Sequence, residues 1–353
     1  MTTTAYVSRP ALVLGEYTVD AYRIRDDILA FNPDHPKREA IRKALTNLPG
    51  TRRYLRPYEE IVAERTTVQR KDDVFEAILE AARKAVIAAT EDVGVALADI
   101  DCLVVSSSTG DRVPGLGVHL CNALGLRPDI RIRSMTQAAC AGGALALICA
   151  EEHLARYPDH TVVVVTGEFL SALYQRSALS LEDQIYKALW GDLAAAAVVA
   201  ARPLGRSPSL RIDHTKEFTI PDTVERYRKV TDERGDHFAS TRASLRSVAD
   251  LAPELLKWLD KHARGPLGFG ILHPGGPAIL AKLAKVLDVD DQFVKHSRDV
   301  LEQEGNLGGP TIFSVLDRTH RTPPRYGQQG LVFGLGPGVT FASLLVTWTD
   351  PHA

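Results

Sequence analysis

The sequence lacks the features that mark membrane, secreted and nucleic-acid-binding proteins. Its first residues contain no basic segment followed by an apolar stretch, and no apolar run reaches the roughly 20 residues that a membrane span requires. The formal charge is only −2 over 353 residues, so no basic excess indicates a polyanionic partner. We therefore expect a cytoplasmic protein that binds neither membranes nor nucleic acid.

Cysteine is scarce as well. The four cysteines are Cys102, Cys121, Cys140 and Cys149, which are too few and too unevenly placed for a disulfide framework. No cysteine or histidine pair has the spacing of a zinc site, so we expect no metal. Each cysteine is then either a small buried hydrophobe or a reactive thiol.

What the sequence does contain is an alternation of helical and strand patterns, which predicts an α/β fold in layers. Helical periodicity covers 75–95 and 144–157, a loop leading into a buried strand is predicted within 96–110, and further strands are predicted at 161–169 and 194–201. After a polar stretch from 201, the second half repeats this order with helices at 248–264 and 276–289 and strands at 268–272 and 330–348. We predict two duplicated halves, 1–205 and 206–353.

The segment Met135-Thr-Gln-Ala-Ala-Cys140-Ala-Gly-Gly places a cysteine where a helix rich in small residues begins. A helix N-terminus stabilises a thiolate, and small residues allow close approach of the backbone. Taken alone, however, a cysteine in this setting also fits simple packing.

Two further segments carry polar side chains beside turns. His273 ends the apolar run Gly270-Ile-Leu and precedes Pro-Gly-Gly-Pro, and strand ends are where side chains enter the clefts of α/β proteins. Asn306 lies between glycines before a predicted helix, where it fits a turn or an N-cap as well as a site.

Together these segments resemble the chalcone synthase-like, or type III, polyketide synthases. His273-Pro-Gly-Gly-Pro-Ala-Ile-Leu resembles the histidine motif of that family, Gly305-Asn306 its asparagine motif, and Gly334-Leu-Gly-Pro-Gly338 its glycine-proline loop, with Leu335 in place of phenylalanine. The resemblance runs from about residue 10 to 348. It implies a thiolase-like αβαβα fold built from two duplicated halves.

The resemblance also implies a catalytic set. Cys140 would be the nucleophile that accepts an acyl group from coenzyme A, and His273 would stabilise its thiolate. His273 and Asn306 would form the oxyanion hole for the enolate left when malonyl-CoA loses carbon dioxide. Coenzyme A thioesters would be substrates, and no cofactor is implied.

Other residues take expected roles from the same resemblance. Trp190 would be the first gatekeeper between the coenzyme A tunnel and the cavity, whereas the second gatekeeper has no clear match in 240–246. The cavity would be lined by Ser108, Leu170, Leu173 and Gly308, and Arg52 and Arg53 lie near the basic cluster of the family that binds coenzyme A. The family implies a homodimer in which the loop at Val113 reaches the cavity of the partner.

The segment around Glu168-Phe-Leu-Ser-Ala-Leu is most similar to that of bacterial tetrahydroxynaphthalene synthases, which carry cysteines where this chain has Leu170 and Leu173. Leucines predict an apolar wall, on which a malonyl starter would leave a carboxylate without a partner. We therefore expect aliphatic or aryl acyl-CoA starters, extended with malonyl-CoA to pyrone- or resorcinol-like products.

Three other interpretations share part of this pattern. A β-ketoacyl carrier-protein synthase of the initiation type uses the same triad, but its histidine usually precedes Gln-Ala-Asn. A non-catalytic acyl-binding homologue would be expected to have lost the cysteine or the histidine. A papain-like protease would carry its cysteine near the mature N-terminus, with disulfides and aromatic neighbours that are absent here.

Overall fold

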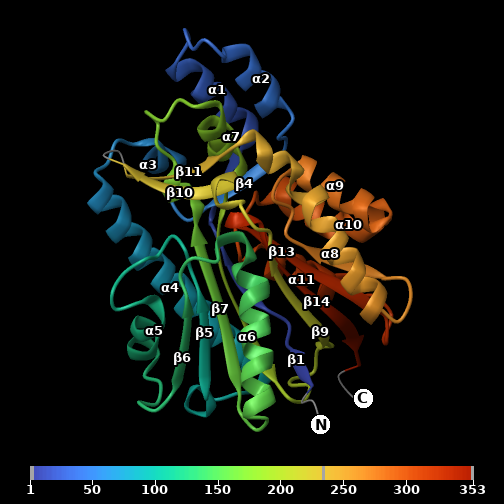
Figure 1. Ribbon diagram of the computed structural model, residues 1–353. Helices are drawn as coiled ribbons and strands as arrows, with labels where there is room; N and C mark the ends of the chain where they lie inside the picture. The colour runs from blue at the N-terminus through green and yellow to red at the C-terminus, as the bar shows by residue number, and fades with distance from the viewer. Residues whose placement is uncertain (1–3, 233–234, 351–353) are drawn as a thin grey trace.

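The computed structural model describes residues 4–232 and 235–350, and these form one mixed sheet flanked by helices (Figure 1). Its strands follow the order β12-β13-β14-β9-β1-β8-β7-β5-β6, and β2 pairs with β8. The bounds are β1 (Ala5–Val7), β2 (Ala11–Leu14), β5 (Cys102–Ser106), β6 (Arg131–Met135), β7 (Val162–Phe169), β8 (Asp192–Ala200), β9 (Ser209–Thr219), β12 (Phe269–Leu272), β13 (Gln329–Gly336) and β14 (Thr340–Thr349).

The two halves of the sheet repeat one pattern of strand directions. In the first half β5 runs parallel to β7, and β7 and β8 are antiparallel, as are β8 and β1. In the second half β12 runs parallel to β13, and β13 and β14 are antiparallel, as are β14 and β9. Strands β1 and β9 pair with each other and join the halves. The repeated order agrees with a duplicated unit; the division at 205/206, in the connection between β8 and β9, stays a prediction.

Helices cover both faces of each half and give five layers. The central layer holds α6 (Gly142–Arg156) and α11 (Thr311–Arg321), whose apolar residues share one core with strands of both halves. The outer layers hold α4 (Thr67–Val93) and α5 (Leu116–Leu124) on one side and α8 (Ser247–His262), α9 (Pro277–Leu287) and α10 (Asp291–Gln303) on the other.

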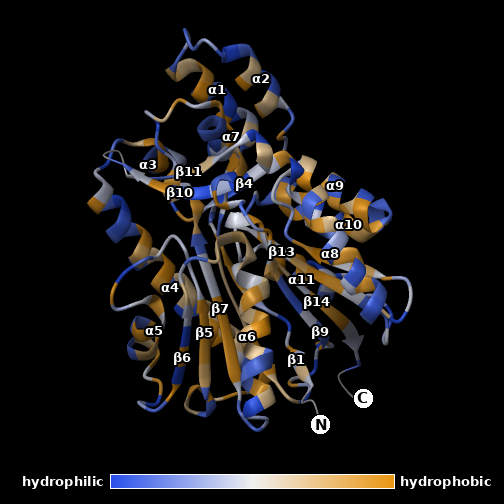
Figure 2. Ribbon diagram, viewed as in Figure 1, coloured by the Kyte–Doolittle hydropathy of each residue, from blue (hydrophilic) through white to orange (hydrophobic). Residues whose placement is uncertain are grey.

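The burial of β5 shows why its sequence forms a central strand. Cys102 and Val104 pack in the core with α6, whereas the alternate residues Leu103 and Val105 pack with α4. A strand buried on both faces is apolar over most of its length, as 102–105 of β5 and 162–165 of β7 are (Figure 2), while the edge strand β6 is largely hydrophilic. The helices and strands that we predicted from periodicity are all present, with boundaries a few residues different.

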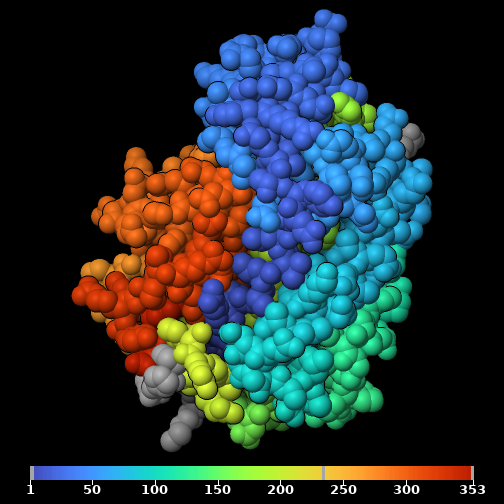
Figure 3. All heavy atoms as spheres, turned by 180° about the vertical axis from the view of Figure 1, so that it is seen from behind, coloured from blue at the N-terminus to red at the C-terminus, as the bar shows by residue number. Residues whose placement is uncertain are grey.

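A cap that periodicity did not predict lies above the layers. It contains β3 (Tyr17–Asp20), α1 (Ala21–Phe31), α2 (Arg38–Thr46), β4 (Thr51–Tyr54) and α3 (Tyr58–Val62), packed with α7 (Leu181–Leu189) in a separate apolar cluster. Seen from behind, this segment forms a blue lobe over both halves (Figure 3). Leu170 and Trp190 belong to the same cluster, so the cap packs against two residues expected at the cavity.

Among the described residues, no helix combines the length and the apolar character needed to cross a membrane.

Candidate active site

Cys140 lies in a single tight turn, η2 (Ala139–Ala141), directly before α6. The preceding Ala139 has φ +43°, a left-handed conformation that costs energy for any residue with a Cβ. Its amide donates a 2.9 Å hydrogen bond to Ser108 Oγ, which helps to hold the turn. Ser108 therefore positions the cysteine in addition to lining the cavity.

Glycines let the starts of the two central helices approach each other. A Cβ added to Gly143 would lie 2.3 Å from the carbonyl oxygen of Gly309, and one added to Gly309 would lie 2.7 Å from that of Ala139. Both contacts involve backbone atoms, which cannot move aside as a flexible side chain can. This close packing brings the Cys140 turn beside the segment that carries Asn306.

His273 follows the last residue of β12, and its backbone amide donates to Phe333 O at 2.8 Å. The side chain is 1 % exposed, and neither ring nitrogen hydrogen-bonds to the residues that the structure describes. Burial lowers the pKa of His273 to about 4, although the backbone of Gly308 acts in the opposite direction. The imidazole is therefore neutral in the free protein, and its nitrogens are available to a substrate.

Asn306 has a fixed amide orientation. Its Oδ1 accepts a 2.9 Å bond from the Gly308 amide, so Nδ2 is the group left to donate, and its contact with Gly275 O is long at 3.4 Å. The backbone is locked as well, since Asn306 N donates to Leu189 O and Gly191 N donates to Asn306 O on either side of Trp190. These backbone hydrogen bonds fix the position of Asn306, the expected oxyanion donor, relative to Trp190, the expected gatekeeper.

The three expected catalytic side chains line one cavity of about 620 Å³. The structure also places on its wall the five other residues expected there: Ser108, Leu170, Leu173, Trp190 and Gly308. The Leu335–Gly338 loop closes part of it, and a Cβ on Gly336 would lie 2.9 Å from Ala138 O, beside the nucleophile turn. One cavity therefore joins residues that lie far apart in the sequence.

The two arginines expected near the coenzyme A site lie outside this cavity, so their contact with coenzyme A stays a prediction. Arg52 is 1 % exposed, and its guanidinium donates to backbone carbonyls, among them Ala188 O at 2.6 Å and Leu48 O at 3.2 Å. Arg53 Nε donates to Gly15 O at 2.7 Å. Neither residue lines the cavity, and both instead tie β4 to its neighbours because buried carbonyls need donors.

Glu168 is a buried carboxylate that the sequence analysis did not assign to the site. Its oxygens accept bonds from the amides of Ser108 at 2.8 Å and Thr109 at 3.0 Å, and from Thr109 Oγ1 at 2.8 Å. Burial raises its pKa, and these three donors oppose the rise. A glutamate at the end of the buried strand β7 was the available signal, because strand ends face clefts.

Two aromatic residues at the cavity were also missed. Phe238 lies edge-on to Trp190 with ring centroids 5.9 Å apart, and Tyr186 stacks on Trp190 at 5.0 Å. Phe238 precedes the 240–246 segment in which no second gatekeeper could be matched. Phe238 therefore lies next to Trp190 on the cavity wall, close in sequence to the segment where a second gatekeeper was sought.

A buried carboxylate fixes the turn that presents the leucines. The turn η3 (Leu170–Leu173) is held by Asp192, which accepts bonds from Ser171 N at 2.9 Å and Ser171 Oγ at 2.6 Å. The same carboxylate accepts from Leu55 N at 3.1 Å, which links the turn to the cap. Burial raises the pKa of Asp192 to about 6.

The thiol of Cys140 is protonated in the free protein. Burial, followed by the nearby charge of Glu168, raises the pKa of Cys140 to about 12, and a backbone hydrogen bond opposes this rise. The thiol and the imidazole are thus both neutral before substrate binds. Among the described residues, no group of three or more histidine, cysteine or acidic side chains could hold a metal ion.

Comparison with known proteins agrees with this geometry. The model of the N-terminal domain of chalcone and stilbene synthases matches residues 35–203, and that of the C-terminal domain matches 253–349. The chain belongs to the chalcone and stilbene synthase family. It is a type III polyketide synthase and therefore an acyltransferase, and the predicted thiolase-like fold is confirmed.

Similar proteins make different products, judging by their names. The polyketide synthase described here is 28% identical to 1,3,6,8-tetrahydroxynaphthalene synthase of Streptomyces griseus over 98% of this chain and 93% of that protein. It is 28% identical to phloroglucinol synthase of Pseudomonas fluorescens over 96% of this chain and 98% of that protein. The structure of germicidin synthase from Streptomyces coelicolor is similar, with a TM-score of 0.92 and 29% sequence identity. The match covers 98% of this chain and 100% of that chain. None of the alternatives to a polyketide synthase is favoured by these matches.

Proposed function

We propose that Cys140, His273 and Asn306 carry out decarboxylative condensation of malonyl-CoA onto an acyl group held on Cys140. The single observation that carries this proposal is the convergence of the three side chains on one cavity of about 620 Å³. In the first step His273 accepts the proton of Cys140, and the thiolate attacks the thioester carbonyl of an acyl-CoA. His273 gives the proton to coenzyme A, which leaves as the thiol, so the imidazole is neutral again and the acyl group stays on Sγ.

The second step forms the carbon nucleophile. The bond between the carboxylate and the α-carbon of malonyl-CoA breaks, carbon dioxide leaves, and its bonding electrons form an enolate. A neutral His273 and the Nδ2 of Asn306 each donate a hydrogen bond to the enolate oxygen. The hydrogen bond from Gly308 to Asn306 Oδ1 supports this role because it directs Nδ2 away from Gly308.

The third step joins the two units. The enolate carbon attacks the thioester on Cys140, a carbon–carbon bond forms, and the Cys140 thiolate leaves as a β-ketoacyl-CoA is released for reloading. Repetition lengthens the chain by two carbons each time, until cyclisation ends it. These steps use coenzyme A thioesters only as substrates, and we propose no resident cofactor.

We propose apolar aliphatic or aryl acyl groups as starters. Leu170 and Leu173 lie on the cavity wall, and Trp190, Tyr186 and Phe238 provide flat apolar surfaces beside them. An acyl chain gains about 0.8 kcal/mol for each methylene that it buries there. Pyrone- or resorcinol-like products are expected from such starters.

We also propose a homodimer in which Val113 reaches the cavity of the partner. Val113 is 96 % exposed, which is unusual for an apolar side chain, and it is close in sequence to Asp111 on the cavity wall.

Incubation of the protein with malonyl-CoA and hexanoyl-CoA tests the reaction. We expect release of carbon dioxide and free coenzyme A, together with extended products seen by mass spectrometry. Cys140→Ala is the matched control because it removes only the sulfur from a small side chain, and it should lose both acyl labelling and product. Elongation by Cys140→Ala would overturn the assignment.

A competition experiment tests the starter. Malonyl-CoA is supplied alone and together with hexanoyl-CoA or longer acyl-CoA, and the products are compared. We expect acyl-primed products to dominate in the mixture. Predominance of 1,3,6,8-tetrahydroxynaphthalene, the product named for one relative, would show that the leucine wall does not select the starter.

A further inference from the structure

A network of four charged side chains stands at one side of the cavity. Lys229 Nζ lies 3.3 Å from a carboxylate oxygen of Asp111 and 3.3 Å from one of Asp236. Lys71, on α4, lies 3.5 Å from Asp236 and 3.9 Å from Asp111. Burial disfavours the ammonium, yet the two carboxylates together raise the pKa of Lys229.

The network joins three separate segments of the chain. Lys229 and Asp236 lie on the hairpin of β10 (Tyr227–Asp232) and β11 (Gly235–Ser240), Lys71 lies on α4, and Asp111 lies on the connection between β5 and α5. The hairpin is also tied to the leucine turn, because Gln175 Nε2 donates to Asp236 O at 2.7 Å. In Figure 1 the hairpin crosses the molecule beside α3 and the upper end of α4.

Lys229 lies between the cavity and a second, smaller space. A cleft of about 30 Å³ is lined by Lys71 and Asp236, which do not line the cavity, whereas Asp111 lines only the cavity. Lys229 lines both spaces, as do Ser108, Thr109 and Leu173, and it is the only charged residue among these four. The ammonium is therefore held between the cavity and the cleft by one carboxylate on each side.

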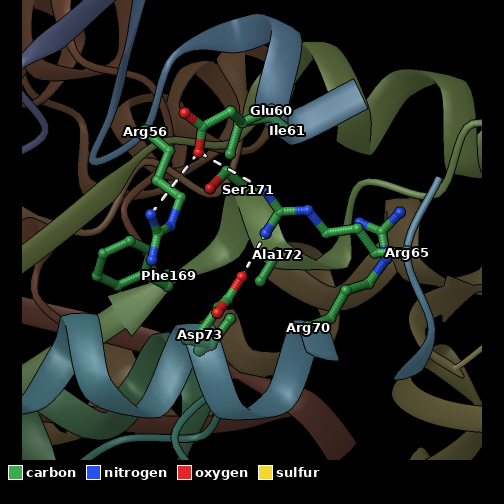
Figure 4. Close-up of a pocket in the computed structure, with 10 residues that line it drawn as sticks. Arg56, Glu60, Ile61, Arg65, Arg70, Asp73, Phe169, Ser171 and Ala172 are labelled. Carbon is green, nitrogen blue, oxygen red and sulfur yellow. Dashed lines mark hydrogen bonds and ion pairs between the residues drawn. The ribbon is translucent and has the colours of Figure 1, made fainter. Parts of the chain in front are cut away.

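Helix α4 is anchored independently of this network. Figure 4 shows a neighbouring pocket in which Arg65 pairs with Asp73 of α4 and with Glu60 of α3. Arg70 of α4 also donates to Tyr174 O and Ala63 O. These contacts hold the start of α4 against α3 and the segment after η3. Shortening Lys229 should therefore widen the cavity without releasing the helix.

We propose that Lys229, held between Asp111 and Asp236, limits the length of the acyl chain that the cavity accepts. The proposal rests on the acyl-CoA reaction described above and adds a specificity-determining residue to it. The Lys229 side chain is 35 % exposed, so its ammonium is paired on one side and hydrated on the other. An apolar chain that reaches it would have to displace that water and end against a charge, which opposes any further gain from burial. Removal of the side chain beyond Cβ would join the cleft to the cavity.

The test compares kcat/KM for dodecanoyl-CoA and hexanoyl-CoA, with malonyl-CoA as extender. Each methylene newly buried in the joined space raises kcat/KM about fourfold, so Lys229→Ala should raise the dodecanoyl-to-hexanoyl ratio about tenfold or more. Lys229→Arg keeps the length and the charge and should keep the wild-type ratio. Asp73→Asn removes an ion pair of the same helix outside the cavity and should also leave the ratio unchanged.

The outcomes separate the two proposals. An unchanged ratio in Lys229→Ala, with hexanoyl-CoA still consumed, would overturn the length limit and leave the condensing reaction intact. An equal rise in Asp73→Asn would also overturn it, because general loosening would then explain the effect. If the wild-type protein released neither coenzyme A nor carbon dioxide with any acyl-CoA, the proposed function would fail and the length limit with it.

Discussion

At the scale of single residues, the central problem is how a buried thiol becomes a nucleophile at neutral pH. The pKa of Cys140 is raised to about 12 by burial and by Glu168, which opposes the stabilisation expected from the start of α6. Cys140 is nevertheless partly exposed to the cavity, so water and substrate can reach it. A proton acceptor is needed beside it, and the unpartnered nitrogens of His273 fit that role.

This argument predicts the pH dependence of Cys140 alkylation. Because its pKa is raised, the thiol is protonated at pH 7, and without a base the thiolate fraction grows about tenfold for each pH unit below that pKa. In His273→Ala we expect slow alkylation by iodoacetamide at pH 7 that recovers as the pH rises. Wild-type protein should react faster at pH 7, and the gap between the two rates should narrow toward pH 10.

The measurement is the iodoacetamide rate between pH 6 and 10, followed by mass spectrometry of the Cys140 peptide. Cys140→Ala serves as the control for labelling of the other three cysteines. Equal rates for wild type and His273→Ala at pH 7 would remove His273 from activation of the thiol.

Asn306 allows a prediction about charge rather than size. Its Nδ2 is the proposed donor to the enolate, so Asn306→Ala should slow malonyl-CoA decarboxylation on the order of 10²-fold or more. Asn306→Asp has nearly the same shape but brings a carboxylate toward the developing negative charge, and it should be at least as slow. Release of carbon dioxide from labelled malonyl-CoA measures both variants. A wild-type rate in Asn306→Asp would exclude the oxyanion role.

At the scale of elements, periodicity in the sequence was sufficient to predict the strands and helices of the layered core. It was not sufficient to predict the cap and the β10–β11 hairpin that cover this core. Strands β5 and β7 are buried on both faces and begin with four consecutive apolar residues each, which makes them recognisable in the sequence. The cap and the β10–β11 hairpin consist of elements of 4 to 11 residues, which are too short for periodicity alone to identify. Their positions depend on tertiary contacts such as those of Arg52 with backbone carbonyls.

The candidate site shows the same division. Recognisable motifs made it possible to predict Cys140, His273 and Asn306. The positions of the Phe238, Asp192 and Lys229 side chains depend instead on contacts between segments that are distant in sequence. The starter argument was incomplete for this reason. Leu170 and Leu173 do line the cavity, but Arg228 and Lys229 line it as well, so its wall is only partly apolar.

The packing of α6 against α11 gives a prediction about stability. A Cβ at position 143 would lie 2.3 Å from Gly309 O and 2.9 Å from Ile312 Cγ1, so the helices must separate to admit it. Gly143→Ala should lower the free energy of unfolding by about 1–3 kcal/mol. It should also slow condensation, because Cys140 and Asn306 move apart.

Denaturant unfolding and product formation measure these two effects. The exposed Glu152 lies on the same helix, and Glu152→Ala should change stability by no more than about 0.5 kcal/mol. A Gly143→Ala protein as stable and active as wild type would show that the contact is not tight.

At the scale of the whole molecule, the site lies where the two duplicated halves meet. Cys140 precedes the central helix of the first half, and Asn306 precedes the central helix of the second. Strands β1 and β9 join the halves into one sheet. The proposed homodimer adds a second level of sharing, in which Val113 of each chain completes the cavity of the other.

Light scattering should therefore give a particle of twice the 38.5 kDa chain mass. Val113→Asp places a carboxylate in the partner's partly apolar cavity and should reduce product formation. Val68→Asp changes another exposed valine, on α4, and is the matched control that should remain active. A monomer at micromolar concentration would contradict the proposal.

Complementation tests whether Val113 acts across the interface. In a mixed dimer of one Val113→Asp chain and one Cys140→Ala chain, the intact Cys140 belongs to the first chain and the intact Val113 to the second. If Val113 reaches the partner, that site is complete, and random assembly of equal amounts should restore about a quarter of wild-type activity. If Val113 packs only against its own chain, the chain with Cys140 also carries Asp at position 113, and co-expression restores nothing. Two affinity tags isolate the mixed dimer, and its product yield distinguishes the two arrangements.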